Sequence, residues 1–161
     1  MIFVNALHSQ KKLDSDVCIP DVVSFELNKV WIYSNNWTVR ASDTFSVDGI
    51  VFHKIYVNSS FTDFSFSNEI NKKIFYVNEK GEKGIFISDE ETPDFFIDSQ
   101  GVKIIIADYH ATLRTPVCEY NDLIALKIDT YVEYYKKGIG FVAATISGKL
   151  DYYLKEIRYN K

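Results

Sequence analysis

The sequence has few of the residues that would mark a disordered, membrane-spanning or metal-binding chain. It contains only three prolines and seven glycines among 161 residues, which argues against low complexity and disorder. No apolar run approaches the roughly 20 residues that a spanning helix needs, so no membrane span is expected. The three histidines, His8, His53 and His110, lack metal-ligand spacing, so we expect neither a metal nor another cofactor.

Positive charge is also scarce. The chain has 18 Lys and Arg against 22 Asp and Glu, which gives a formal net charge of -4. Proteins that bind nucleic acid normally carry a basic patch, so no nucleic-acid partner is expected. The charge is compatible with a cationic protein partner, although mild acidity is also common among soluble proteins.

Cysteine is limited to Cys18 and Cys118. Their separation fits neither a redox CxxC pair nor a zinc-binding set. In an exported chain the two could form a disulfide that closes a long loop, worth about 3–4 kcal/mol. In a cytoplasmic chain they would be two small buried hydrophobic residues.

The N-terminus changes character abruptly. Residues 2–7 are apolar, and residues 8–12 are polar and basic. This resembles the second half of a secretory signal without its basic leader. We therefore interpret residues 1–9 as a remnant of a secretion signal, within a lead-in over residues 1–20, and expect a single domain over residues 21–161. The alternative is an ordinary first strand of a cytoplasmic protein.

Aromatic residues are abundant: the chain has 12 Phe and 11 Tyr, and 16% of its residues are aromatic. Many stand beside Val and Ile, as is typical of strands. Short alternating segments recur about every 8–12 residues, separated by turn residues. The sequence therefore predicts an all-β fold, an antiparallel meander of about ten strands curled into a half-barrel or open barrel, with little or no helix.

Several segments carry more specific predictions. Asp48-Gly49 is the strongest hairpin signal. Residues 58–71 are interpreted as a long loop with one short strand. Residues 102–107 form the most apolar strand and are expected to be central in the sheet. Trp31 and Trp37 are expected to anchor the core, since large aromatic side chains dominate burial.

Residues 122–135 fit two patterns. Their apolar positions match one face of a helix, but they also alternate as strands do. The β-branched and aromatic residues favour two strands with a turn near Asp129-Thr130. The following Gly138-Ile139-Gly140 is interpreted as a structural bulge or sharp strand bend, in which both glycines serve the backbone.

The order of these signals resembles a family of exported bacterial β-meander domains of uncharacterised function, curled into half-barrels. The segments that carry the resemblance are residues 25–33, the hairpin over residues 43–55, the strand–turn–strand over residues 75–86, the Tyr-Tyr-Lys-Lys-Gly-Ile-Gly-Phe-Val run over residues 134–142, and residues 151–154. The resemblance implies the fold and export to the periplasm, cell surface or medium. It implies no catalytic activity, because none of these motifs carries a catalytic residue.

Asp108, His110 and a nearby Ser99 or Thr112 are residue types used in nucleophilic catalysis. No GxSxG elbow or comparable glycine pattern accompanies them. We therefore predict that the protein is not an enzyme.

Aromatic residues offer the best binding hypothesis. In a curled sheet one face can line a groove, and adjacent tyrosines point to opposite faces. We predict a non-catalytic binding or scaffold domain whose ligand is an unknown protein or an apolar small molecule. The predicted contact residues are Phe61, Phe64, Phe66, Tyr134, Tyr135 and Tyr152; the alternative is that these rings are ordinary core.

A second functional hypothesis uses the acidic turn Asp89-Glu90-Glu91. A small acidic cytoplasmic protein of this kind could inhibit a basic toxin, as immunity proteins do, and its binding would then be salt-sensitive. The alternative interpretation of the same residues is an ordinary solvated turn between strands, without a binding role. A monomer and a homodimer are both compatible with the sequence.

Overall fold

The computed structural model describes residues 27, 29–68, 70, 73–88, 95–97 and 102–159. These residues form twelve β-strands and no helix, so the predicted all-β fold is confirmed with twelve strands rather than about ten. The strands are β1 (Lys29–Tyr33), β2 (Thr38–Val47), β3 (Ile50–Val57), β4 (Ser60–Ser67), β5 (Lys73–Asn78), β6 (Lys83–Ser88), β7 (Phe95–Ile97), β8 (Lys103–Arg114), β9 (Glu119–Ile128), β10 (Tyr131–Lys136), β11 (Gly140–Ile146) and β12 (Lys149–Tyr159). Within this part of the chain, no helix is long and apolar enough to cross a membrane.

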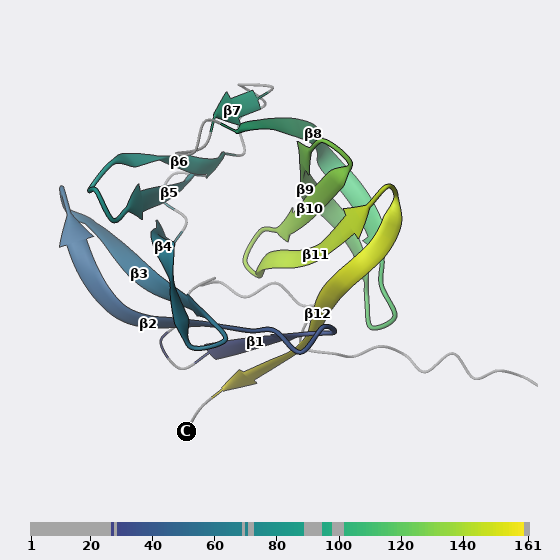
Figure 1. Cartoon of the computed structure of the whole chain (residues 1–161), viewed down its shortest axis with the longest axis horizontal. Coiled ribbons are helices and arrows are strands. Elements are labelled where there is room, and N and C mark those ends of the chain that lie inside the picture. The colour runs from purple at the N-terminus through teal and green to yellow at the C-terminus, as the bar shows by residue number, and fades with distance from the viewer. Residues whose placement is uncertain are drawn as a thin grey trace, which may run out of the picture.

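All twelve strands belong to one antiparallel sheet in the order β6-β5-β4-β3-β2-β1-β12-β11-β10-β9-β8-β7. Each strand pairs with its neighbours in the chain, except that β1 and β12 pair with each other, and β6 and β7 form the two edges. The sheet curls so that these edges approach the same side of the molecule (Figure 1). The result is the predicted open barrel, with its ladder unclosed between β6 and β7.

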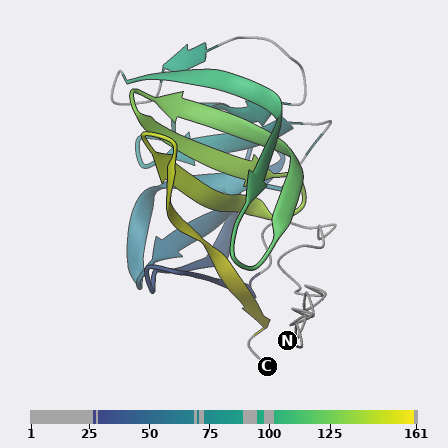
Figure 2. The ribbon, with the colours of Figure 1, turned by 90° about the vertical axis from the view of Figure 1, so that its right-hand side faces the viewer.

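Strand β12 connects the two halves of the sheet. Its first residues, up to Tyr153, pair with β11, and its last residues, from Leu154, pair with β1. In the side view, β12 runs obliquely from the layer of β9–β11 to the level of β1 (Figure 2). The switch of partners therefore coincides with the bend that curls the sheet.

Two-residue turns close the hairpins around β3. Asp48 and Gly49 both have positive φ, at 50° and 78°, as the turn predicted at this dipeptide requires. Asn58 and Ser59 adopt the same kind of geometry, at 50° and 70°. The prediction of a long loop with one short strand over residues 58–71 was therefore wrong: β4 begins at Ser60 and extends for eight residues.

The ambiguous segment 122–135 is strand throughout, apart from its turn. β9 ends at Ile128 and β10 begins at Tyr131, with Asp129 at a positive φ of 55° between them. The prediction of two strands joined near Asp129-Thr130 is confirmed. β10 pairs with β9 on one side and with β11 on the other, so its residues alternate between the two faces of the sheet, as the sequence pattern indicates.

Gly138-Ile139-Gly140 is not a bulge within a strand. β10 ends at Lys136 and β11 begins at Gly140, so Gly138 lies in the turn of a hairpin and Gly140 is the first residue of the returning strand. Both have positive φ, 78° at Gly138 and 95° at Gly140, which a glycine adopts without strain. The irregular pairing of this hairpin lies elsewhere, between Tyr134 and Tyr135.

Strand β8 contains the most apolar run of the sequence but is not central. It lies next to the edge and pairs there with β7, which has only three residues. Its pairing with β9 shifts register three times, and Ile105 is 41% exposed. The prediction of a central strand was therefore wrong. It was based on hydrophobicity, whereas the position of a strand in a meander sheet follows its order in the chain.

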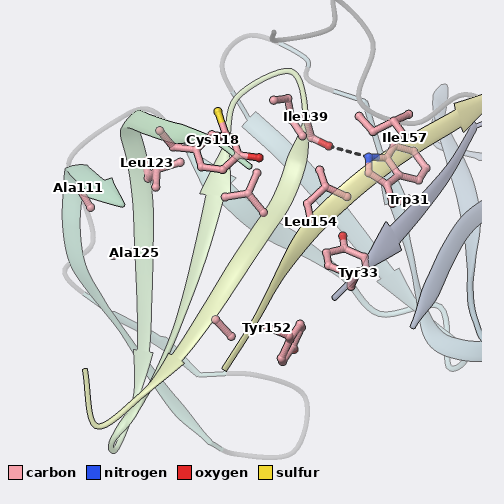
Figure 3. Packing of buried hydrophobic residues seen from close by; sticks show 13 residues of the cluster. Trp31, Tyr33, Ala111, Cys118, Leu123, Ala125, Ile139, Tyr152, Leu154 and Ile157 are labelled. Carbon is pink, nitrogen blue, oxygen red and sulfur yellow. Dashed lines mark hydrogen bonds between the residues drawn. The ribbon is translucent and has the colours of Figure 1, made fainter. Parts of the chain in front are cut away.

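The core cluster of buried side chains comes from β1, β8, β9, β11 and β12 and the turns beside them. Trp31 is 3% exposed and donates a hydrogen bond from Nε1 to the carbonyl oxygen of Ile139 at 3.2 Å (Figure 3). Trp31 thus anchors the core as predicted. The prediction for Trp37 was wrong, because its side chain lies in a turn before β2 and is 45% exposed.

Some predictions fall on residues that the structure does not describe. These are the N-terminal lead-in over residues 1–20 and the acidic turn Asp89-Glu90-Glu91. Cys18 is another. Cys118 is buried and is not a free cysteine, but its pairing with Cys18 stays a prediction.

Candidate functional site: an aromatic cavity inside the curled sheet

A cavity of about 230 Å³ lies inside the curl of the sheet. It is lined by side chains from β1 to β6 on one half and from β10 to β12 on the other, with the turns beside them. The lining residues are Trp31, Tyr33, Trp37, Val39, Ile55, Val57, Phe66, Ile74, Phe86, Glu133, Tyr135, Ile139, Gly140, Phe141 and Tyr152. Trp37 is the most exposed of these lining residues, at 45%.

Alternation along the strands explains which residues line the cavity. Residues two apart on a strand share a face. β1 contributes Trp31 and Tyr33, β3 contributes Ile55 and Val57, and β10 contributes Glu133 and Tyr135.

The aromatic rings form a continuous series across the cavity. Centroid separations are 4.7 Å for Phe66–Phe86, 5.3 Å for Phe86–Tyr135 and 5.5 Å for Tyr135–Phe141. Phe141 then contacts Tyr152, and Tyr152 contacts Trp37 at 5.3 Å. These distances suit tilted and edge-to-face aromatic pairs. The Phe86–Tyr135 contact also joins β6 to β10, which lie in opposite halves of the sheet.

Two polar groups of the lining residues form hydrogen bonds to the backbone of the protein. Trp31 Nε1 donates to the carbonyl oxygen of Ile139, and the Tyr33 hydroxyl donates to the carbonyl oxygen of Phe141 at 3.1 Å. Both bonds tie β1 to the β10–β11 hairpin. They satisfy these donors within the protein, so neither is presented to the cavity as a spare donor.

Glu133 is the exception in this apolar lining. Its Oε2 accepts a 2.7 Å hydrogen bond from the hydroxyl of Tyr135, and its carboxyl also interacts with the hydroxyl of Tyr131. The Tyr131 and Tyr152 hydroxyls lie 2.7 Å apart. A hydroxyl has only one proton, so when Tyr131 donates to Glu133, Tyr152 must donate to Tyr131.

Burial shifts the titration of this cluster. Desolvation raises the pKa of Glu133 above its ordinary value, and the hydrogen bonds from Tyr135 and Tyr131 oppose that rise only in part. Desolvation also raises the pKa of Tyr135 and Tyr131, and the nearby Glu133 carboxyl raises them further. All three groups therefore favour their protonated forms more strongly than they would in water.

The structure brings together half of the predicted contact residues. Phe66, Tyr135 and Tyr152 line the cavity. Phe61 does not: it is 39% exposed and packs on Tyr56 with ring centroids 5.6 Å apart. Tyr134 is only partly buried and packs against the core cluster, as expected for the opposite face from Tyr135. The side chain of Phe64 lies outside the described part of the chain.

Sequence reasoning missed several lining residues: Tyr33, Phe86, Glu133 and Phe141. A signal existed for Glu133, because it alternates with Tyr131 and Tyr135 and must share their face. A signal existed for Tyr33 too, two residues after the predicted core residue Trp31. Nothing local indicated Phe86, which reaches the cavity only because the sheet curls.

Asp108 and His110 do not make the carboxylate-to-ring contact of a catalytic triad, and Ser99 lies outside the described residues. Asp108 Oδ1 accepts a hydrogen bond from the backbone N–H of His110, not from its ring. The ring Nδ1 lies 3.6 Å from Asp122, and both side chains are more than two-thirds exposed, at 71% and 76%. Among the residues that the structure describes, no group of three His, Cys, Asp or Glu side chains could hold a metal ion.

Comparison with known proteins adds no assignment: no family model matches the chain, and neither the curated proteins nor the solved structures give a significant match.

Proposed function

We propose that the protein is a non-catalytic binding domain that holds a small apolar ligand in the cavity of its curled sheet. The observation that supports this most directly is the aromatic lining of the cavity, which includes the exposed side chain of Trp37. Ligand sites are typically concave and mostly apolar, with a few placed polar groups. The cavity has this composition, with Glu133 and its tyrosine partners as the polar groups.

The size of the cavity limits the ligand. Sites for drug-sized molecules usually span roughly 300–1,000 Å³, and this cavity is about 230 Å³. A single ring with a short substituent fits that space better than a long acyl chain. Apolar burial then supplies most of the affinity, at about 25 cal/mol per Å² of area removed from water.

The test is a titration with 2-phenylethanol, a neutral probe of this size. Both tryptophans of the chain, Trp31 and Trp37, line the cavity, so their fluorescence reports on occupancy directly. We expect saturable changes in emission and a rise in the melting temperature, because a ligand that binds only the folded state stabilises it.

Two variants of one strand provide the matched control. Val57→Phe adds a ring to the lining of the cavity, and Val51→Phe adds the same ring at a position that is 51% exposed on the same strand, β3. We expect Val57→Phe to weaken binding of 2-phenylethanol about tenfold or more by occupying its space, and Val51→Phe to leave it unchanged. Equal affinity in both variants would show that the probe binds elsewhere.

Export is the second part of the proposal and has its own support, the resemblance of residues 25–159 to exported β-meander domains. Mass spectrometry of the native protein in each cell fraction tests it. A chain that begins near Gln10 in the envelope or medium is the expected result. An intact Met1 in the cytoplasm would contradict export and would favour the acidic inhibitor instead.

A further inference from the structure

In the part of the chain that the structure describes, the lining of the cavity contains one carboxyl group and no basic side chain. Among the described residues that line it, Glu133 is the only Asp, Glu, Lys, Arg or His. The other lining residues are apolar or aromatic, and the donors of Trp31 and Tyr33 are already bonded to backbone carbonyls. The lining therefore presents a single acidic centre within an aromatic wall.

The tyrosine hydroxyls position this carboxyl but do not occupy all of its hydrogen-bond acceptor sites. Tyr135 bonds to Oε2 at 2.7 Å, and Tyr131 interacts with the same carboxyl. An ionised carboxylate has about four lone-pair sites on its two oxygens. Two donors therefore leave room for further N–H donors from an occupant of the cavity.

An anion, a neutral apolar molecule and a cation would each interact differently with Glu133 if they occupied the cavity. An anion would be repelled by an ionised carboxylate in a low-dielectric site. A neutral apolar molecule would leave the carboxyl desolvated without a new partner, which is unfavourable. A cation would compensate the buried charge and favour its ionised form.

The aromatic rings support the same class of occupant. Trp, Tyr and Phe faces attract cations within about 6 Å of the ring centroid. One lining ring already does so: the ammonium group of Lys29 lies 5.9 Å from the centroid of Trp31. Aromatic walls around a single carboxylate are the chemistry that recognises organic ammonium groups.

We infer that the cavity binds a small protonated amine with an apolar or aromatic body, with its ammonium group against Glu133 and its body among the aromatic rings. This inference rests on the proposed function, because it names the class of ligand for the same cavity. It adds a specificity-determining residue, Glu133, which a purely apolar site would not need.

The experiment compares three probes of nearly equal size: 2-phenylethylammonium, 2-phenylethanol and phenylacetate. Each is titrated near neutral pH and followed by tryptophan emission and by calorimetry. We expect the ammonium probe to bind about tenfold or more tightly than the alcohol, with phenylacetate weakest. Equal affinity for the ammonium and the alcohol, or a preference for phenylacetate, would overturn the inference.

Two variants with the same change of charge assign the selectivity. Glu133→Gln keeps an oxygen that accepts hydrogen bonds from tyrosine, so the fold should persist. Glu119→Gln removes a carboxylate from an exposed position on β9. Selectivity, measured in each variant as the ratio of the affinities for 2-phenylethylammonium and 2-phenylethanol, should disappear in Glu133→Gln and persist in Glu119→Gln. Selectivity that survives in Glu133→Gln would overturn the role of this residue.

The two proposals fail in different ways. Binding of 2-phenylethanol that is blocked by Val57→Phe, without any preference for the ammonium probe, would retain the apolar cavity and reject the amine. If no probe changes tryptophan emission or stability, the cavity is not a site for ligands of this size, and both proposals are rejected.

Discussion

The hydroxyl of Tyr135 donates a 2.7 Å hydrogen bond to the carboxyl of Glu133, two residues earlier on the same strand. Residues two apart on a strand share a face, so both side chains point into the same cavity. The pair places an acidic group among aromatic rings and fixes its orientation. This relationship makes stability dependent on both the protonation of Glu133 and the hydroxyl of Tyr135.

Glu133→Gln should change how stability depends on pH. The folded protein holds the Glu133 proton to a higher pH than the unfolded chain, because burial raises the pKa above its ordinary value of 4.5. The free energy of unfolding should therefore fall as pH rises through and above 4.5, until the raised pKa of the folded state is passed. Urea unfolding from pH 4 to about pH 8 measures this dependence.

The glutamine variant lacks this titration. Its stability relative to the wild type should increase from pH 4 toward neutral pH. Glu119→Gln, which removes an exposed carboxylate from β9, is the control for the change of charge. Parallel profiles for wild type and Glu133→Gln would contradict the raised pKa.

Tyr135→Phe should destabilise the protein more than Tyr134→Phe. The first change removes a hydroxyl that donates to the buried Glu133 carboxyl, and leaving a buried acceptor with one donor fewer costs about 1–3 kcal/mol. Tyr134 is the adjacent tyrosine on the opposite face, and we expect its variant to lie within about 0.5 kcal/mol of the wild type. Urea denaturation decides between them, and equal destabilisation would show that the hydroxyl of Tyr135 is not specially important.

The buried tyrosines should ionise only when the protein unfolds at alkaline pH. Burial, first among the causes, raises the pKa of Tyr33, Tyr131 and Tyr135 above the ordinary value of 10.0. Their contribution to stability is therefore complete below pH 10 and is lost as pH rises beyond it. Tyrosinate absorbance and circular dichroism followed together should show a late step of ionisation that coincides with loss of strand signal. Complete ionisation while the fold persists would contradict this.

Leu154→Ala should be far more costly than Leu150→Ala. Both residues belong to β12, but Leu154 is fully buried and Leu150 is 37% exposed. Truncating a buried leucine typically costs about 2–5 kcal/mol, because it removes apolar contact and leaves a cavity. The Leu150 variant should cost much less, about 0.5 kcal/mol. Thermal unfolding measures both, and similar losses would mean that the region of Leu154 is not the core of the fold.

The strands and hairpin turns could be predicted from the sequence, because each is specified by a short segment of neighbouring residues. Asp48-Gly49 specifies a hairpin through its own backbone preferences. The strands of residues 122–135 follow from alternation and β-branched residues. Asn58-Ser59 was missed because no glycine marks that turn, although both residues adopt positive φ.

The cavity could be predicted only in part. Phe66, Tyr135 and Tyr152 were expected as contact residues from their aromatic character, and they do line it. Their meeting with Phe86 depends on how far the sheet curls, which no short segment encodes. The burial of Glu133 has the same origin: alternation places it on the face of Tyr135, but only the opposite half of the sheet removes it from water.

The pairing of β1 with β12 has a consequence for the order in which the protein assembles. Each remaining ladder joins neighbours in the chain and can form as a local hairpin, whereas this one brings together segments that are 119 residues apart at Ser34 and Tyr153. Ladders between distant segments form slowly, because a long loop must close before any contact rewards it. The cavity is lined by residues from both sides of this ladder. Neither half alone can therefore form the complete cavity, and we expect it to be assembled only when β1 pairs with β12.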